Sequence, residues 1–238
     1  AMFSPGRNWE QIRTTIAYND RKVVIVGSHA GVSVGPDGGT HQALEDIALM
    51  RVMPNMEVIS PCDSLEAKRA TLELAKSKKP AYLRLAREKT PIITTEETPF
   101  EIGKSEIYFL PDIGLAEVGI IATGGLMYQA LLAAKELEND GMKVKVMNLA
   151  TIKPLDQNAI LKLAQEAKCI VTVEEHQMHG GVGSAVAEFL AEKFPVPIEF
   201  VAVRDVFGQS GTPEELIKHY GLDKKAIVEA VKRVVRRK

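Results

Sequence analysis

Short apolar runs alternate with amphipathic segments through the first 85 residues. Runs such as Val23–Val26 hold consecutive apolar side chains, which is typical of strands buried on both faces. The segments between them repeat apolar side chains every three to four residues, as Trp9, Ile12 and Ile16 do, which predicts helices. The predicted strands are 23–27, 57–60 and 81–85, and the predicted helices are 6–18, 41–52 and 65–77. This alternation favours parallel strands joined by right-handed crossovers.

Residues that cap helices refine where the helices begin. We expect Thr40 to cap helix 41–52, and Asp63 or Ser64 to cap helix 65–77. The inward face of helix 41–52 would carry Leu44, Ile47, Ala48 and the stem of Arg51.

The same alternation returns in the second half. It predicts strands at 118–122, 143–148, 169–174 and 198–203, and helices at 126–139, 157–167, 184–193, 213–219 and 223–237. Residues 151–156 are expected to form a turn, with Asp156 capping the helix that follows.

The segment between the two halves is polar and rich in proline. We expect residues 99–112 to be a linker with an edge strand at 105–110. Residues 1–98 and 113–238 would then be two consecutive α/β domains with largely parallel sheets.

Charge and composition exclude several classes of function. Lys and Arg number 30 against 31 Asp and Glu, so no overall field favours nucleic acid or a membrane surface. Five of the last seven residues are basic, which fits a solvated helix end or an anionic partner. No apolar stretch reaches the length of a membrane span. Cys62 and Cys169 lie in or beside apolar runs, which favours two buried thiols in a reducing, cytoplasmic environment.

The candidate chemistry gathers in a glycine-rich stretch, residues 28–42, which we call the glycine loop. It follows a predicted buried strand and carries His29, Asp37 and His41. Ligands of open α/β sheets bind beyond the carboxyl ends of the strands. A histidine there can move a proton or bind a phosphate oxygen, and an aspartate can accept from a hydroxyl. From the residues alone, these side chains could equally cap the next helix. Their spacing fits no zinc motif, so we expect no metal site.

Two further motifs lie at predicted strand ends. If strand 81–85 neighbours strand 23–27, Arg87 leaves the sheet beside His29, where a guanidinium could clamp a phosphate. The alternative is a surface ion pair near Glu88. Residues 180–184 read Gly-Gly-Val-Gly-Ser before a helix, which fits a phosphate cradle or close packing of helix on strand. The complete dinucleotide fingerprint is absent, so packing is the preferred interpretation.

The glycine loop, His-Ala-Gly-Val-Ser-Val-Gly-Pro-Asp-Gly-Gly-Thr-His-Gln over 29–42, resembles the pyrimidine-binding domain of the transketolase family. The match continues through 51–56, 60–63 and Leu85-Ala86-Arg87, and residues 113–238 resemble the family's C-terminal domain. Pro36 stands where the family usually has an acidic residue. The resemblance implies a thiamine-diphosphate-dependent transferase that moves a two-carbon ketol unit between sugar phosphates, within the pentose phosphate pathway.

The resemblance also implies roles for individual residues. His29 and Arg87 would hold the substrate phosphate, and Asp37 a substrate hydroxyl. His41 would lie over the reacting carbons as the catalytic hydrogen-bond donor or acid–base group. Phe3 and Arg7 look, as bare residues, like a core ring and a solvated charge. By the resemblance, Phe3 would stack on the aminopyrimidine ring of the cofactor with Arg7 nearby, although the segment is one residue longer than the family spacing.

Other parts of the family pattern have no counterpart in these residues. The domain that binds the diphosphate through Mg or Ca is missing, and so is the glutamate that activates the cofactor. We therefore expect a C-terminal section with an incomplete pyrimidine-binding domain, inactive alone and needing a separate N-terminal subunit, in a homodimeric assembly.

Related enzymes are the alternatives to this interpretation. They are 1-deoxyxylulose-5-phosphate synthase, a 2-oxoacid dehydrogenase β-type subunit, and a non-catalytic assembly module of the same fold. The run Ser28-His29-Ala30-Gly31 favours transketolase over the synthase, and the sequence Gly-Pro-Asp-Gly-Gly-Thr-His favours it over the dehydrogenase. A pure scaffold would not need His29, Asp37, His41 and Arg87.

Overall fold

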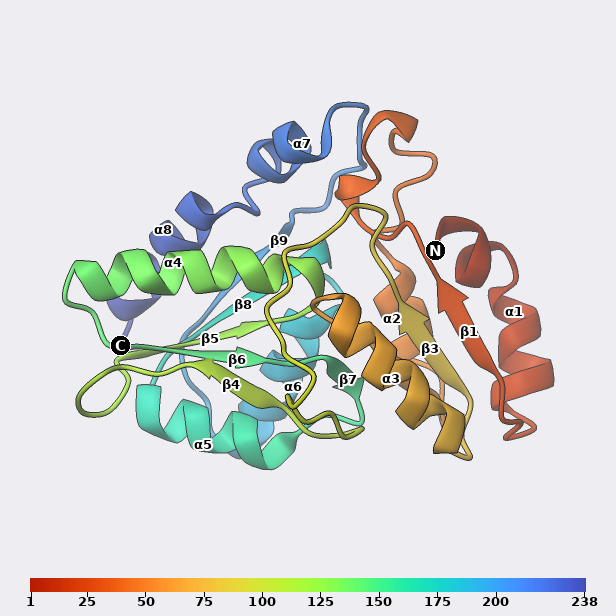
Figure 1. The fold of residues 1–238 in the computed structure, drawn as a ribbon, viewed down its shortest axis with the longest axis horizontal. Coiled ribbons are helices and arrows are strands. Elements are labelled where there is room, and N and C mark those ends of the chain that lie inside the picture. Colours follow the sequence, from red (N-terminus) through yellow and green to blue (C-terminus); the bar gives the residue numbers. More distant parts are fainter.

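Two mainly parallel sheets organise the chain, one built largely from each half of the sequence (Figure 1). The computed structural model describes all residues from 1 to 238. The predicted fold class, two consecutive α/β domains with largely parallel sheets, is confirmed. None of the helices combines the length and the apolar character that a membrane span requires.

The first sheet has the strand order β1-β3-β2-β7. Its strands are β1 (Val24–Gly27), β2 (Glu57–Ile59), β3 (Ala81–Arg84) and β7 (Thr151–Lys153). The three strands from the first half are parallel, as their helical connections predict. The helical segments of this half are Met2–Arg7, α1 (Trp9–Gln11), Ile12–Ala17, Val32–Asp37, α2 (Asp46–Arg51) and α3 (Ser64–Lys76).

Strand β7 corrects the expected turn at 151–156. It runs antiparallel to β2, with Lys153 opposite Val58 and Thr151 opposite Ile59. The chain thus crosses from the second sheet into the first, where the Ser60 N–H donates to the Ala150 carbonyl at 2.8 Å. A three-residue strand is too short to show a local periodicity in the sequence. It forms because β2 offers a free edge.

The start of α2 also differs from the prediction, since the helix begins at Asp46 and Thr40 is not its cap. The reason lies in the backbone just before the helix. The Ala43 carbonyl accepts the Gly31 N–H at 2.9 Å, and Ala43 bridges Ala30 as a short parallel pair. Ala43 is therefore held against the first residues of the glycine loop, and the helix begins only after it. In contrast, the Asp63 carboxylate caps α3 by accepting the Glu66 N–H at 2.8 Å, as predicted.

The second sheet has the strand order β4-β6-β5-β8-β9. Its strands are β4 (Glu106–Phe109), β5 (Val118–Ala122), β6 (Val144–Asn148), β8 (Ile170–Gln177) and β9 (Ile198–Val203). Strand β4, the expected edge strand of the linker segment, pairs antiparallel with β6, and the other neighbours are parallel. Strand β8 continues three residues beyond the predicted end at 174.

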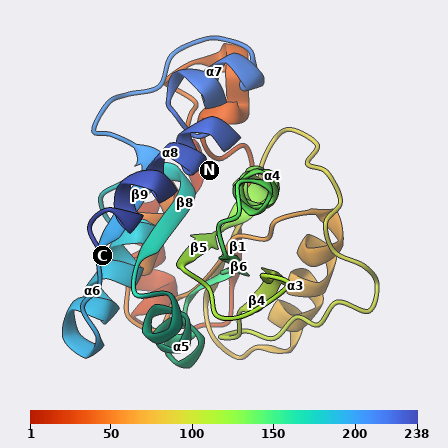
Figure 2. The same ribbon diagram turned by 90° about the vertical axis from the view of Figure 1, so that its left-hand side faces the viewer.

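Helices cover both faces of the second sheet (Figures 1 and 2). They are α4 (Met127–Asn139), α5 (Gln157–Ala167), α6 (Val182–Lys193), α7 (Pro213–His219) and α8 (Lys224–Val235). Ile120 of β5 belongs to the core under α4 and α8, whereas the next residue, Ile121, belongs to the core under α5 and α6. Both cores also contain residues of the first half, such as Leu44 and Ile47. The two halves therefore share their hydrophobic cores, and each supports the other.

Candidate active site

Strands β1 and β3 end side by side, so the segments that follow them share one edge of the first sheet. The Leu85 N–H donates to the Gly27 carbonyl at 2.8 Å, and the Ala30 N–H donates to the Leu85 carbonyl at 3.2 Å. The sequence interpretation of Arg87 required these strands to be neighbours, and they pair in parallel. His29 and Arg87 consequently leave the sheet at the same edge.

Arg87 lies against the glycine loop and meets Asp37. Its Nη1 donates to the Val34 carbonyl at 2.7 Å and to Oδ1 of Asp37 at 3.1 Å. Both side chains of this ion pair are more than a third exposed, at 36% and 41%. Water screens such a pair, so it contributes little to stability, and an anion can compete with Asp37 for the guanidinium. Glu88 lies farther from Arg87, with 3.9 Å between Nε and Oε1.

His41 is part of an exposed aromatic cluster with Phe3 and Arg7. The rings of Phe3 and His41 meet edge to face, with 5.2 Å between their centroids. The guanidinium of Arg7 lies 4.8 Å from the centroid of the Phe3 ring. The Phe3 side chain is 48% exposed, so it is a surface ring and not the core residue that the bare sequence suggests. Nδ1 of His41 lies 2.9 Å from the Thr40 hydroxyl, and the His41 residue is exposed.

The backbone at His29 adopts an uncommon conformation, with φ at +60°. Residues other than glycine rarely adopt this left-handed backbone conformation, and those that do often lie at functional sites. The ring is exposed, and its Nδ1 lies 3.1 Å from the Ser28 hydroxyl. The structure thus presents the histidine at the surface of the same sheet edge that holds Arg87.

A buried ion pair that the sequence patterns did not predict lies beside the glycine loop. Nε of Arg84 donates to Oδ2 of Asp46 at 2.7 Å, and the Tyr82 hydroxyl donates to the same oxygen at 2.7 Å. Burial raises the pKa of Asp46, but the charge and hydrogen bonds of Arg84 outweigh it and hold the pKa below its usual range. An arginine inside a predicted buried strand was the available signal, because such a charge needs a buried partner.

The same arginine reaches the C-terminal half of the chain. Nη2 of Arg84 donates to the Glu175 carbonyl at 2.9 Å, and thereby holds the end of β8 against β3. Burial raises the pKa of the Glu175 carboxyl, and a hydrogen bond from the Ser33 N–H opposes this effect. Asp46, Arg84 and Glu175 therefore form one buried polar network that spans both sheets.

The Gly-Gly-Val-Gly-Ser motif at 180–184 is used for packing, as preferred from the sequence. The Glu174 carboxylate accepts the N–H groups of Val182 and Gly183 at 2.7 and 2.8 Å, so it occupies the N-terminus of α6. A Cβ at Gly181 would lie 2.0 Å from Oε2 of Glu174. The position that a phosphate would need is thus filled by the chain itself. Burial raises the pKa of Glu174 to about 7.

His176 is buried and neutral. Its Nδ1 donates to the Gln177 carbonyl at 2.7 Å, and its Nε2 accepts the Ala48 N–H at 3.4 Å. These bonds satisfy both nitrogens of a neutral ring and leave no room for a second proton. Burial lowers the pKa of His176 to about 4.

This lowered pKa predicts how a His176→Gln variant responds to pH. Between pH 6.5 and 4 the unfolded chain binds a proton at this residue and the folded chain does not, so acid selectively destabilises the parent protein. At pH 7 the parent should have a higher free energy of unfolding than the variant. This difference should be smaller at pH 4 by up to about 3 kcal/mol. Denaturant titrations of both proteins across this range would measure it. Glu174 is present in both proteins, so its titration does not produce the difference between them. A difference in unfolding free energy that does not change with pH would contradict the prediction.

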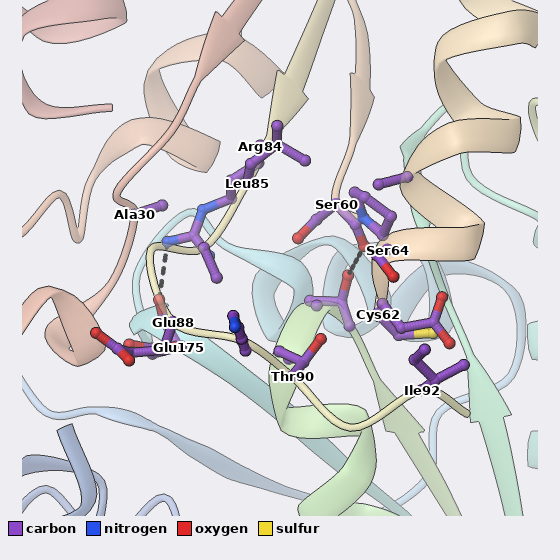
Figure 3. A pocket seen from close by; sticks show the side chains of 18 residues that line it. Ala30, Ser60, Cys62, Ser64, Arg84, Leu85, Glu88, Thr90, Ile92 and Glu175 are labelled. Carbon is purple, nitrogen blue, oxygen red and sulfur yellow. Dashed lines mark hydrogen bonds between the residues drawn. The ribbon is translucent and has the colours of Figure 1, made fainter. Parts of the chain in front are cut away.

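A cavity of about 510 Å³ lies between the two halves (Figure 3). Its wall includes Ser60 and Ser64 near the start of α3, Thr90 after β3, and Thr123 after β5. His29, Asp37, His41 and Arg87 do not line this cavity. His29, Asp37 and His41 lie in the glycine loop and Arg87 lies after β3, and all four residues are exposed.

Two family models match the chain. The model described as transketolase, pyrimidine binding domain, matches residues 1–92. The model described as transketolase, C-terminal domain, matches residues 115–227. Together they span most of the chain, and the glycine loop and Arg87 lie within the first match.

Individual relatives agree with the family models. A 6-deoxy-6-sulfo-D-fructose transketolase subunit of Clostridium sp. is 39% identical, over 99% of this chain and 72% of that protein. An apulose-4-phosphate transketolase subunit of Phocaeicola vulgatus is 34% identical, over 100% of this chain and 75% of that protein. A solved structure described as a split-gene transketolase, an inactive tetramer, superposes with a TM-score of 0.91 at 38% identity. The superposition covers 99% of this chain and 74% of that chain.

Proposed function

The chain belongs to the transketolase family as a C-terminal section, and we propose that it supplies the substrate side of a thiamine-diphosphate-dependent active site. Residues 1–98 are its part of the pyrimidine-binding domain, 99–112 the linker and 113–238 the C-terminal domain. The reaction moves a two-carbon ketol unit from a ketose phosphate to an aldose phosphate, as in the pentose phosphate pathway. The observation that carries this proposal is the meeting of Arg87 with the glycine loop at the edge where His29 emerges.

The residues of the aromatic cluster fit the organic part of the cofactor. Thiamine diphosphate contains an aminopyrimidine ring, and the half-exposed Phe3 ring offers an apolar aromatic surface for stacking. Arg7 would lie at the rim of that contact. When bound, the cofactor supplies the carbon nucleophile of the reaction. The edge-to-face contact between Phe3 and His41 supports a role of His41 next to the reacting carbons.

Each side chain of the site has a role in this proposal that follows from its chemistry. Arg87 and His29 bind the substrate phosphate, the arginine through a charge-assisted pair of N–H donors. Asp37 accepts from a substrate hydroxyl once phosphate has taken its place on Arg87. The Thr40 hydroxyl orients His41 through Nδ1, so that Nε2 donates to or accepts from the substrate oxygen during proton transfer.

The remaining half of the site comes from a separate N-terminal subunit in this proposal. That subunit would hold the diphosphate together with a Mg or Ca ion. In this chain, no group of three or more His, Cys, Asp or Glu side chains is arranged to hold a metal. A split-gene relative is described as inactive in a tetrameric form, which supports a need for a partner. The proposed assembly is a homodimer of such pairs in the cytoplasm, where its two free, buried cysteines stay reduced.

An Arg87→Ala variant tests the function directly. In the complex with the N-terminal subunit, thiamine diphosphate and magnesium, the parent chain should transfer ketol units between sugar phosphates. The variant loses a charge-assisted clamp worth about 1.5–3 kcal/mol, so KM for a phosphorylated ketose should rise by roughly 10- to 150-fold. Steady-state kinetics with a phosphorylated and a non-phosphorylated ketose would compare the two donors.

The non-phosphorylated donor is the internal control, because Arg87 has no phosphate to bind there. Equal increases in KM for both donors would show that Arg87 does not bind the substrate phosphate. A parent complex that transfers ketol units from no ketose phosphate would refute the proposed function and favour a non-catalytic module.

A further inference from the structure

The glycine loop rests on the C-terminal half of the chain. Its helical stretch Val32–Asp37 packs against α7, and the two lie side by side in both views (Figures 1 and 2). Nε2 of Gln42 donates to the carbonyls of Val32 and Gly35 within the loop, at 3.1 and 3.2 Å. It also donates to the Gln209 carbonyl of the C-terminal domain at 3.0 Å. The conformation of the loop is therefore tied to that domain.

One carboxylate of the C-terminal domain binds the loop backbone directly. Oε1 of Glu175, at the end of β8, accepts the Ser33 N–H at 2.5 Å, and both residues are buried. Gly31 lies against the same carboxylate, where a Cβ would come within 2.2 Å of Oε1. The backbone there has φ at +85°, a conformation that favours glycine. The loop is thus shaped around this side chain.

Glu175 is itself held firmly. Arg84 donates to its carbonyl at 2.9 Å, and Asp46 fixes the guanidinium from the other side. The carboxylate therefore projects from an anchored backbone, and its reach to Ser33 is set by the length of its own side chain. Ser33 lies midway along the sequence between His29 and Asp37, so one hydrogen bond fixes the part of the loop that connects them.

We propose that Glu175 is a positioning residue, through which the C-terminal domain holds His29, Asp37 and His41 in place for substrate. This inference rests on the proposed function, since it assigns these three residues to the substrate site. It gives the C-terminal domain a part in the reaction without contact between that domain and substrate.

The neighbouring residue Glu174 provides a matched control. It is also buried on the same strand, but its carboxylate points to the other side and binds the N-terminus of α6. A substitution there removes two buried hydrogen bonds from the core, against one at Glu175, and it does not remove the bond to the glycine loop.

Three conservative variants separate positioning from stability in the complex with the N-terminal subunit. Glu175→Asp keeps the charge but is one methylene too short to reach Ser33, and it should raise KM for the sugar phosphate about tenfold. Glu175→Gln keeps an oxygen at the right distance and should stay within about threefold of the parent. Glu174→Asp should lower Tm as much as Glu175→Asp and leave KM within about twofold. Hydrogen exchange of the backbone amides of Ser33, Val34, Gly35 and Asp37 should speed up in Glu175→Asp alone.

Positioning is refuted if Glu175→Asp lowers Tm without changing KM or loop exchange, or if Glu174→Asp raises KM equally. A parent complex without ketol transfer would refute the proposed function instead. In that case the exchange measurement on the parent and the three variants still decides whether Glu175 holds the loop.

Discussion

Asp46→Ala is expected to lower the free energy of unfolding by about 3–5 kcal/mol, the largest stability effect that we predict for one side chain. Asp46 and Arg84 are 2% and 6% exposed, and the carboxylate accepts from both Arg84 and the Tyr82 hydroxyl. Removing it leaves a buried guanidinium without its counter-charge and a buried hydroxyl without an acceptor. Chemical denaturation monitored by circular dichroism would measure the loss.

The exposed pair of Asp37 and Arg87 is the natural control for this prediction. Asp37→Ala also removes an Arg–Asp pair, here a single bond of 3.1 Å that solvent screens, so less than about 1 kcal/mol should be lost. Equal losses for the two aspartates would show that burial does not govern the strength of these pairs. That result would contradict the picture of a buried network that joins the two sheets.

His41→Ala is expected to lower kcat of the complex by about 10²–10⁴-fold, the effect typical of removing a general acid or base. Nδ1 of His41 lies 2.9 Å from the Thr40 hydroxyl, and Nε2 is the atom that faces substrate in the proposed function. The guanidinium of Arg7 lies against the same Phe3 ring, 4.8 Å from its centroid. Steady-state kinetics with saturating thiamine diphosphate and sugar phosphates would give kcat.

Two variants control for this result. His179→Ala removes an exposed histidine after β8 and should leave kcat unchanged. Thr40→Val removes only the orienting hydrogen bond, so kcat should fall by about fivefold. If His41→Ala raised KM and left kcat within about threefold, His41 would bind substrate without taking part in proton transfer.

Local patterns predicted most of the architecture. Strands such as β1 and β5 stand out as apolar runs, and the predicted caps Asp63 and Asp156 accept N–H groups of their helices by local hydrogen bonds. The sequence interpretation of Arg87 depended on β1 and β3 being neighbours, and the structure shows this parallel pairing. The glycine loop was recognisable because its sequence is specific to the family.

The errors lie where distant segments decide the conformation. Thr40 resembles a helix cap, but the backbone around Ala43 pairs with the loop and delays α2 to Asp46. Strand β7 exists only because β2 has a free edge. The direct contact of Arg87 with Asp37 also depends on how the loop folds back over the end of β3.

The sequence by itself determined the order of the strands and helices, the two α/β units, and the loop that carries the candidate chemistry. These features follow from periodicity and capping over a few residues. Only the tertiary structure decided which buried charges are partners. Arg84 bonds Asp46 across 38 positions and Ser33 bonds Glu175 across 142, because strand pairing brings distant groups together where water is excluded. A buried charge signals that it needs a partner, but the fold determines which residue that partner is.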